Sequence, residues 1–124
     1  MSNNRFDDES TVVGEQPLLT TIQRGGKPFV LQQIDGPGAP QSHTLELDEI
    51  IIGRSVQAHI SIESGRLSRK HLMLQRRGTE FTCTDLNSSN GVYLNGVKAH
   101  SAVLRDGDTI QIGDVVFVYH EGTG

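Results

Sequence analysis

Short apolar runs alternate with turn-forming residues along most of the chain. From Lys27 onward, runs rich in Val, Ile, Leu and Phe recur at intervals of roughly eight to twelve residues, separated by Gly, Pro, Asn and Asp. No window has the 3.6-residue period of an amphipathic helix. The pattern predicts strands at residues 28–34, 44–47, 49–54, 59–62, 71–76, 80–84, 92–94, 97–98, 102–104, 108–112 and 115–120. We therefore expect an all-β fold, an antiparallel β-sandwich of about eleven strands.

The residues between these runs favour tight turns. Asn95-Gly96 is the sharpest hairpin signal, because both central residues of a type I′ turn need positive φ. Arg77-Gly78, Asp106-Gly107 and Gly113-Asp114 are further turn signals. Fourteen glycines and no tryptophan agree with a chain of many short strands.

The first 26 residues differ from the rest of the chain. They contain the acidic cluster Asp7-Asp8-Glu9, lack a sustained period and end in Gly25-Gly26. We expect a flexible N-terminal tail at 1–26 and one sandwich domain at 27–121. The sequence stops at "HEGTG", directly after the last predicted strand, which is typical of a module from a longer protein. An output domain, such as a kinase or a cyclic-nucleotide synthase, is expected beyond residue 124.

Charge and composition narrow the classes of partner. The formal net charge of −4 and a pI near 5.6 leave no basic field over the whole molecule that would attract nucleic acid or anionic lipid. No run approaches the roughly 18 apolar residues of a membrane span. Cys83 is the single cysteine and no signal peptide is evident, which indicates a reducing, cytoplasmic setting.

Three polar segments carry residues that the fold itself does not need. They are Gly53-Arg54 at the end of a predicted strand, residues 66–71 ("RLSRKH") and residues 87–91 ("NSSNG"). Loops at one end of a sandwich can converge on one surface. A dianionic phosphate needs a guanidinium fork, hydroxyl or amide donors and no nearby carboxylate, and these segments supply such groups without an acid. The pattern indicates a phosphate-binding surface.

These segments also carry a resemblance to a known family. The order "GR", "SRKH" and "NSSNGVYLNG" resembles the forkhead-associated (FHA) domain, a phosphothreonine-binding module, and the likeness extends over roughly residues 29–119. The family fold is an eleven-stranded β-sandwich, in agreement with the strand pattern. We expect this chain to be a bacterial member of the family. Ser89 departs from the threonine that many members carry there, but it keeps the hydroxyl.

The resemblance implies a role for each motif residue. It implies that the phosphate is bound by Arg54, Ser68, Arg69 and Ser89. It implies that Asn90 binds the main chain of the peptide and that Arg66 reads a residue after the phosphothreonine, with a preference for acids. Gly53, His71 and Gly91 are implied to support the loops. No catalytic residue, metal or cofactor is expected, and the dispersed histidines 43, 59, 100 and 120 lack ligand spacing.

The tail contains a candidate ligand for this surface. Thr11 follows Asp7, Asp8 and Glu9 and precedes a valine, a pattern that looks like a bacterial Ser/Thr kinase target. Phosphorylation would add about −1.5 to −2 charges. The expected partners are a Ser/Thr protein kinase and a phosphothreonine-containing protein, or the chain's own tail phosphorylated at Thr11. An incidental threonine in a flexible tail is the alternative.

Two other function classes remain as alternatives. A domain that binds nucleic acid, or a non-phosphorylated protein, through its basic loops is one alternative, and it would use Arg66, Arg69, Lys70, Arg76 and Arg77. The acidic net charge, the scarcity of aromatics and the absence of a recognition helix argue against it. An enzyme would use Ser68 or Ser89 as nucleophile with His71 as base and Asp85 to orient it, but no nucleophile elbow or phosphate-cradling glycine loop is present.

Overall fold

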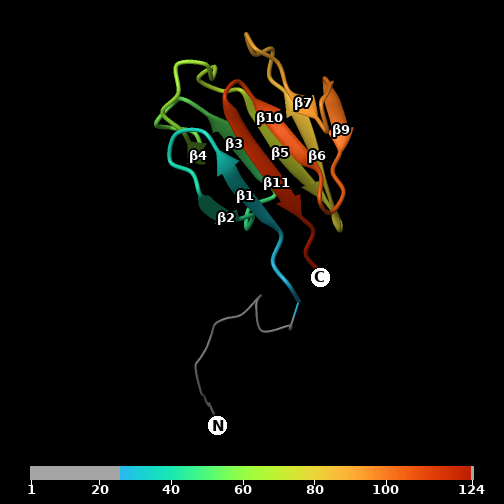
Figure 1. Ribbon diagram of the computed structural model, residues 1–124. Helices are drawn as coiled ribbons and strands as arrows, with labels where there is room; N and C mark the ends of the chain where they lie inside the picture. The colour runs from blue at the N-terminus through green and yellow to red at the C-terminus, as the bar shows by residue number, and fades with distance from the viewer. Residues whose placement is uncertain (1–25, 124) are drawn as a thin grey trace. The chain divides into compact units, whose positions relative to one another are not determined.

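Eleven strands pair into two sheets (Figure 1). The computed structural model describes residues 26–123, so nearly all of the predicted tail, including Thr11, lies outside the described residues. The strands are β1 (Val30–Asp35), β2 (Gln41–Thr44), β3 (Glu49–Gly53), β4 (Ile60–Ser61), β5 (Leu72–Arg77), β6 (Glu80–Asp85), β7 (Tyr93–Leu94), β8 (Val97–Lys98), β9 (Ser101–Val103), β10 (Thr109–Ile112) and β11 (Val115–His120).

The larger sheet has six strands in the order β2-β1-β11-β10-β7-β8, and the smaller has five in the order β4-β3-β5-β6-β9. All pairings are antiparallel except that of β3 with β4, which is parallel. The predicted all-β sandwich is therefore confirmed, with one parallel pair in the second sheet. Among the described residues no helix is long and apolar enough to cross a membrane.

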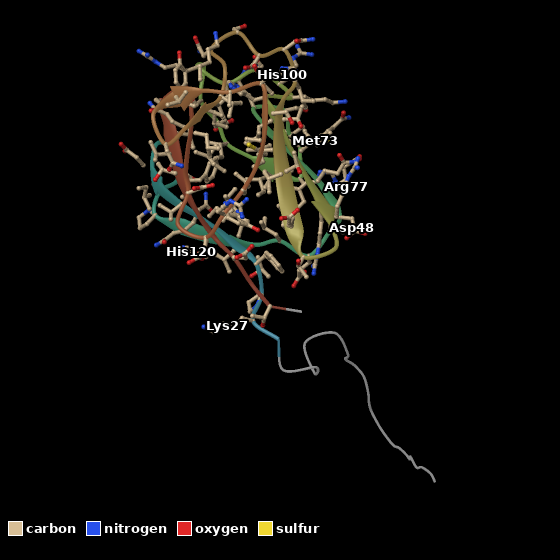
Figure 2. The ribbon with its side chains drawn as sticks, turned by 90° about the vertical axis from the view of Figure 1, so that its right-hand side faces the viewer. Lys27, Asp48, Met73, Arg77, His100 and His120 are labelled. Carbon is tan, nitrogen blue, oxygen red and sulfur yellow. The ribbon has the colours of Figure 1, made fainter. Side chains whose placement is uncertain are left out.

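The core lies between the two sheets and follows the period-two pattern of the sequence. In β5, Leu72 and Leu74 are fully buried, whereas Met73 and Arg77 lie on the outer side of the sheet (Figure 2). Phe81 packs edge-on against Phe29 and Tyr119, with ring centroids 5.5 and 6.3 Å apart. A fully buried side chain of this size contributes about 1.5–3 kcal/mol to stability.

The structure confirms the predicted hairpin turn at Asn95-Gly96 but not the strand predicted at 44–47. Asn95 and Gly96 have φ of 50° and 84°, as the predicted hairpin requires. The strand predicted at 44–47 is wrong, because β2 is the polar segment Gln41–Thr44 and Leu47 is 52% exposed. An edge strand with one neighbour buries few side chains, so β2 lacks the apolar alternation that identifies the others.

Candidate functional site

The end of β3 is joined to the loop before β5 through backbone and side-chain bonds. The Arg54 and Ser55 amides donate to the carbonyls of Ser68 and Arg69 at 3.0 and 3.1 Å. The Arg54 side chain crosses to the same loop, where its Nε donates to the Leu67 carbonyl at 3.1 Å. This bond fixes the direction of the guanidinium and leaves its two terminal nitrogens available to a ligand.

Gly53 permits this close approach. A Cβ at Gly53 would overlap the carbonyls of Ser68 and Arg69, so no side chain fits there without separating β3 from the loop. Its φ is ordinary, and the need for glycine comes from space alone. The resemblance implied a loop-supporting role for Gly53, and the contact supplies a physical reason for it.

His71 connects the second segment with the third. The ring is fully buried; its Nδ1 accepts the Ser68 amide at 3.1 Å, and its Nε2 lies 2.7 Å from the Gly91 carbonyl. Because Nδ1 accepts, the neutral ring carries its proton on Nε2 and donates it to Gly91. Both ring nitrogens are thus engaged in holding loops, which removes the base that the enzyme hypothesis requires.

The loop between β6 and β7 is braced from within. The Asp85 carboxylate accepts the Ser88 hydroxyl at 2.6 Å and the Ser88 amide at 3.0 Å, and the Ser88 hydroxyl accepts the Gly91 amide at 2.9 Å. Asn87 and Gly91 adopt positive φ of 56° and 78°. The carboxylate of Asp85, the supposed orienter of a catalytic histidine, therefore holds the turn that follows β6.

Two further bonds bring this loop against the second segment. The Ser89 amide donates to the Ser68 hydroxyl oxygen at 3.1 Å, and Asn90 Nδ2 donates to the Arg66 carbonyl at 2.7 Å. Ser68 keeps its own hydroxyl proton, and Asn90 keeps its carbonyl oxygen and a second amide proton for a ligand. The bonds therefore bring Arg54, Ser68, Ser89 and Asn90 onto one surface, beside the exposed Arg66 and Arg69.

A shallow pocket of about 280 Å³ adjoins this surface. It is lined by Arg66, Asn90, Tyr93, Gln111 and Gly113. Tyr93 pairs with Gln111 on one side and with Lys98 on the other, so the three side chains form one cross-strand row. Lys98 also packs across Gly91, where a Cβ would lie 3.0 Å from its Cε.

Sequence reasoning missed Tyr93, Lys98 and Gln111. They lie on strands rather than in the polar loops, and only the register of β7, β8 and β10 brings them to the site. Within residues 26–123 no group of three His, Cys, Asp or Glu side chains could hold a metal ion. The arrangement offers cations, hydroxyls and amides, which suit an anionic ligand with a peptide backbone.

Known proteins with similar sequences belong to one domain family. The family model for the FHA domain matches residues 50–113. The oxoglutarate dehydrogenase inhibitor of Corynebacterium jeikeium is 33% identical over 88 residues, which are 71% of this chain and 61% of that protein. The glycogen accumulation regulator GarA of Mycolicibacterium smegmatis is 34% identical over 87 residues, which are 70% of this chain and 55% of that protein.

A solved structure supports the same family. Mycobacterium tuberculosis EmbR in complex with a low-affinity phosphopeptide superposes with a TM-score of 0.72 at 29% identity, over 79% of this chain and 25% of that one. The matches to the first curated relatives cover about three-fifths of those proteins' length or less. The family match covers more than half of the chain and includes all three motifs. The chain belongs to the FHA domain family, as its motifs predicted.

Proposed function

We propose that the surface formed by Arg54, Ser68, Ser89 and Asn90 binds the phosphate and the adjoining backbone of a phosphothreonine peptide, without catalysis. The observation that carries the proposal is the network joining the three loops. Arg54 is held by the Leu67 carbonyl, Ser68 by Ser89, and Asn90 by Arg66. These contacts hold the binding groups together before a ligand arrives, which reduces the ordering entropy that binding costs.

The chemistry of the exposed groups supports a phosphate rather than a carboxylate ligand. The free nitrogens of Arg54 can form paired bonds to two phosphate oxygens, and the Ser68 hydroxyl can donate to a third. Arg69 is exposed beside them and adds positive charge. In this proposal Ser89 assists the phosphate, and Asn90 uses its free oxygen and amide proton on the peptide main chain.

The wider role that we propose is regulation within Ser/Thr kinase signalling, in the cytoplasm. Two relatives are named as an inhibitor and a regulator, which supports a non-enzymatic role for this domain. EmbR was solved with a phosphopeptide, which supports the same class of ligand. The proposed partners are a phosphothreonine-containing protein and the kinase that modifies it.

The tail supplies a second possible source of the ligand, and we include it in the proposal. Phosphorylated Thr11 would occupy the surface of its own chain or of a second copy. About 17 residues separate Thr11 from the first predicted strand, and a flexible chain of that length would span roughly 20–25 Å. A tether of that length gives an effective concentration on the order of millimolar. That concentration would saturate a site of micromolar affinity.

The direct test is Arg54→Ala. We expect the variant to lose phosphothreonine-peptide affinity by at least about 100-fold, the factor for a charge-assisted pair worth roughly 3 kcal/mol. The matched control is Arg77→Ala, because Arg77 is an exposed arginine on the outer side of β5 (Figure 2). Calorimetric titration measures both variants. Unchanged affinity in Arg54→Ala would refute the proposed surface.

A further inference from the structure

Ser64 is a buried hydroxyl that the motifs do not account for. It is 5% exposed, and together with Gln33 and His71 it is one of three buried polar residues within 26–123. Its hydroxyl donates to the Asp114 carboxylate at 2.6 Å and accepts the Arg66 amide at 3.2 Å. The bond to Asp114 joins residues 50 positions apart in the sequence. A short bond to a carboxylate is among the stronger kinds of hydrogen bond.

Arg66 is held on both sides of its peptide backbone by this arrangement. Its amide donates to Ser64, and its carbonyl accepts Asn90 Nδ2 at 2.7 Å. The chain of bonds therefore runs from Asp114 through Ser64 and Arg66 to Asn90. It connects the β10–β11 turn of the six-stranded sheet with two loops of the recognition surface.

The β10–β11 turn also contacts Arg66 directly. A Cβ at Gly113 would lie 2.9 Å from both the Cβ and the carbonyl oxygen of Arg66, so the turn and the loop are in close contact. Arg66 and Gly113 are two of the residues that line the 280 Å³ pocket beside Asn90. The Ser64–Asp114 bond thus fastens one wall of the pocket to the other.

The structure assigns Ser64 and Asp114 as positioning residues of the recognition surface. Their bond fixes the place of Arg66 relative to Asn90 and Gly113, and thereby sets which ligand side chain the pocket accepts. This assignment rests on the proposed function, because it concerns selectivity among phosphothreonine peptides. Neither residue is assigned a contact with the phosphate.

The selectivity among phosphothreonine peptides shows whether the Ser64–Asp114 bond positions Arg66 or only stabilises the domain. If the bond only stabilised the domain, its loss would weaken all phosphothreonine peptides by the same factor. If it places the Arg66 guanidinium, its loss lowers the preference for an acidic over a basic side chain at the ligand position that reaches the pocket. The ratio of the two affinities is therefore the informative quantity.

The test uses a phosphothreonine peptide library in which each of the four positions after the phosphothreonine is fixed in turn as Asp or Lys. It compares the wild-type chain with Ser64→Ala, Asp114→Ala and Asp114→Asn. Asparagine keeps an oxygen that can accept the Ser64 hydroxyl. The control is Ser101→Ala, which removes the 3.2 Å bond to Thr84 between β6 and β9.

We expect an Asp-over-Lys preference at one position in the wild type. It should fall about 3- to 10-fold in Ser64→Ala and Asp114→Ala, the factor for one hydrogen bond. Asp114→Asn should restore most of it, and Ser101→Ala should leave it unchanged. Asp114 is exposed, so Asp114→Ala tests the assignment even if Ser64→Ala fails to fold.

Two outcomes would overturn the assignment, and they have different meanings. A wild type that selects phosphothreonine peptides with the same Asp-to-Lys ratio as Asp114→Ala would refute the positioning role and leave the proposed function standing. A wild type that retains no phosphothreonine peptide from the library would refute the proposed function, and the positioning role with it.

Discussion

At the scale of single residues, buried polar groups in this domain differ in how well they are paired. His71 is fully buried with both ring nitrogens bonded to loops of the site. The Tyr119 hydroxyl is also buried, but it has no hydrogen-bond partner among the described residues. Burial raises the pKa of Tyr119 to about 12. An unpaired buried hydroxyl reduces stability, whereas the His71 bonds maintain the site.

Tyr119→Phe should therefore increase the free energy of unfolding by up to about 1 kcal/mol at neutral pH. The unfolded phenol ionises near pH 10 and the folded one near pH 12, so the unfolded state loses its proton first. Ionisation of Tyr119 therefore leaves the stability of the wild type unchanged below pH 10 and lowers it as the pH rises toward 12. Urea denaturation at pH 8 and pH 11 should show a smaller decline for Tyr119→Phe than for the wild type. An equal decline would contradict the assigned pKa.

At the scale of strands and loops, the contact between β3 and the loop before β5 determines both the stability of the domain and the position of Arg54. Gly53→Ala would place a Cβ against the carbonyls of Ser68 and Arg69, and relieving the overlap should cost about 1–3 kcal/mol of stability. It should also weaken phosphopeptide binding, because Arg54 moves with the end of β3. Gly65→Ala is the control, since no heavy atom outside Gly65 and its two chain neighbours lies within 4 Å of its Cβ position. Thermal unfolding and calorimetry measure both effects, and equal behaviour of the two variants would contradict the account.

This scale also explains what the sequence could and could not predict. The Gly53-Arg54 segment and "SRKH" could be predicted to lie on one surface because their polar residues are contiguous in the sequence, and the hydrogen bonds between the two segments agree. Tyr93, Lys98 and Gln111 could not, because they reach the site through the register of three strands. The Ser64–Asp114 bond joins segments 50 residues apart, and no local pattern indicates it. β2 was misplaced because a polar edge strand has no hydrophobic period.

At the scale of the whole molecule, the question is whether the chain regulates itself. We expect a chain phosphorylated at Thr11 to bind an external phosphothreonine peptide at least about 10-fold more weakly than the unmodified chain, because the tethered ligand competes at millimolar effective concentration. After treatment with the kinase that modifies Thr11, the Thr11→Ala variant should keep the peptide affinity of the unmodified chain. Thr20→Ala is the matched control, because Thr20 is a threonine of the same tail without acidic neighbours, and it should behave like the wild type. Equal peptide affinity before and after modification of Thr11 would contradict tail binding.

The central claim is that three separate loops form one phosphate-binding surface. Amide and side-chain NMR shifts recorded during titration with a phosphothreonine peptide test it most directly. We predict saturable shifts at Arg54, Ser68, Ser89 and Asn90 together, and no shifts with the unphosphorylated peptide. Shifts confined to other parts of the domain, or equal shifts with both peptides, would contradict the claim.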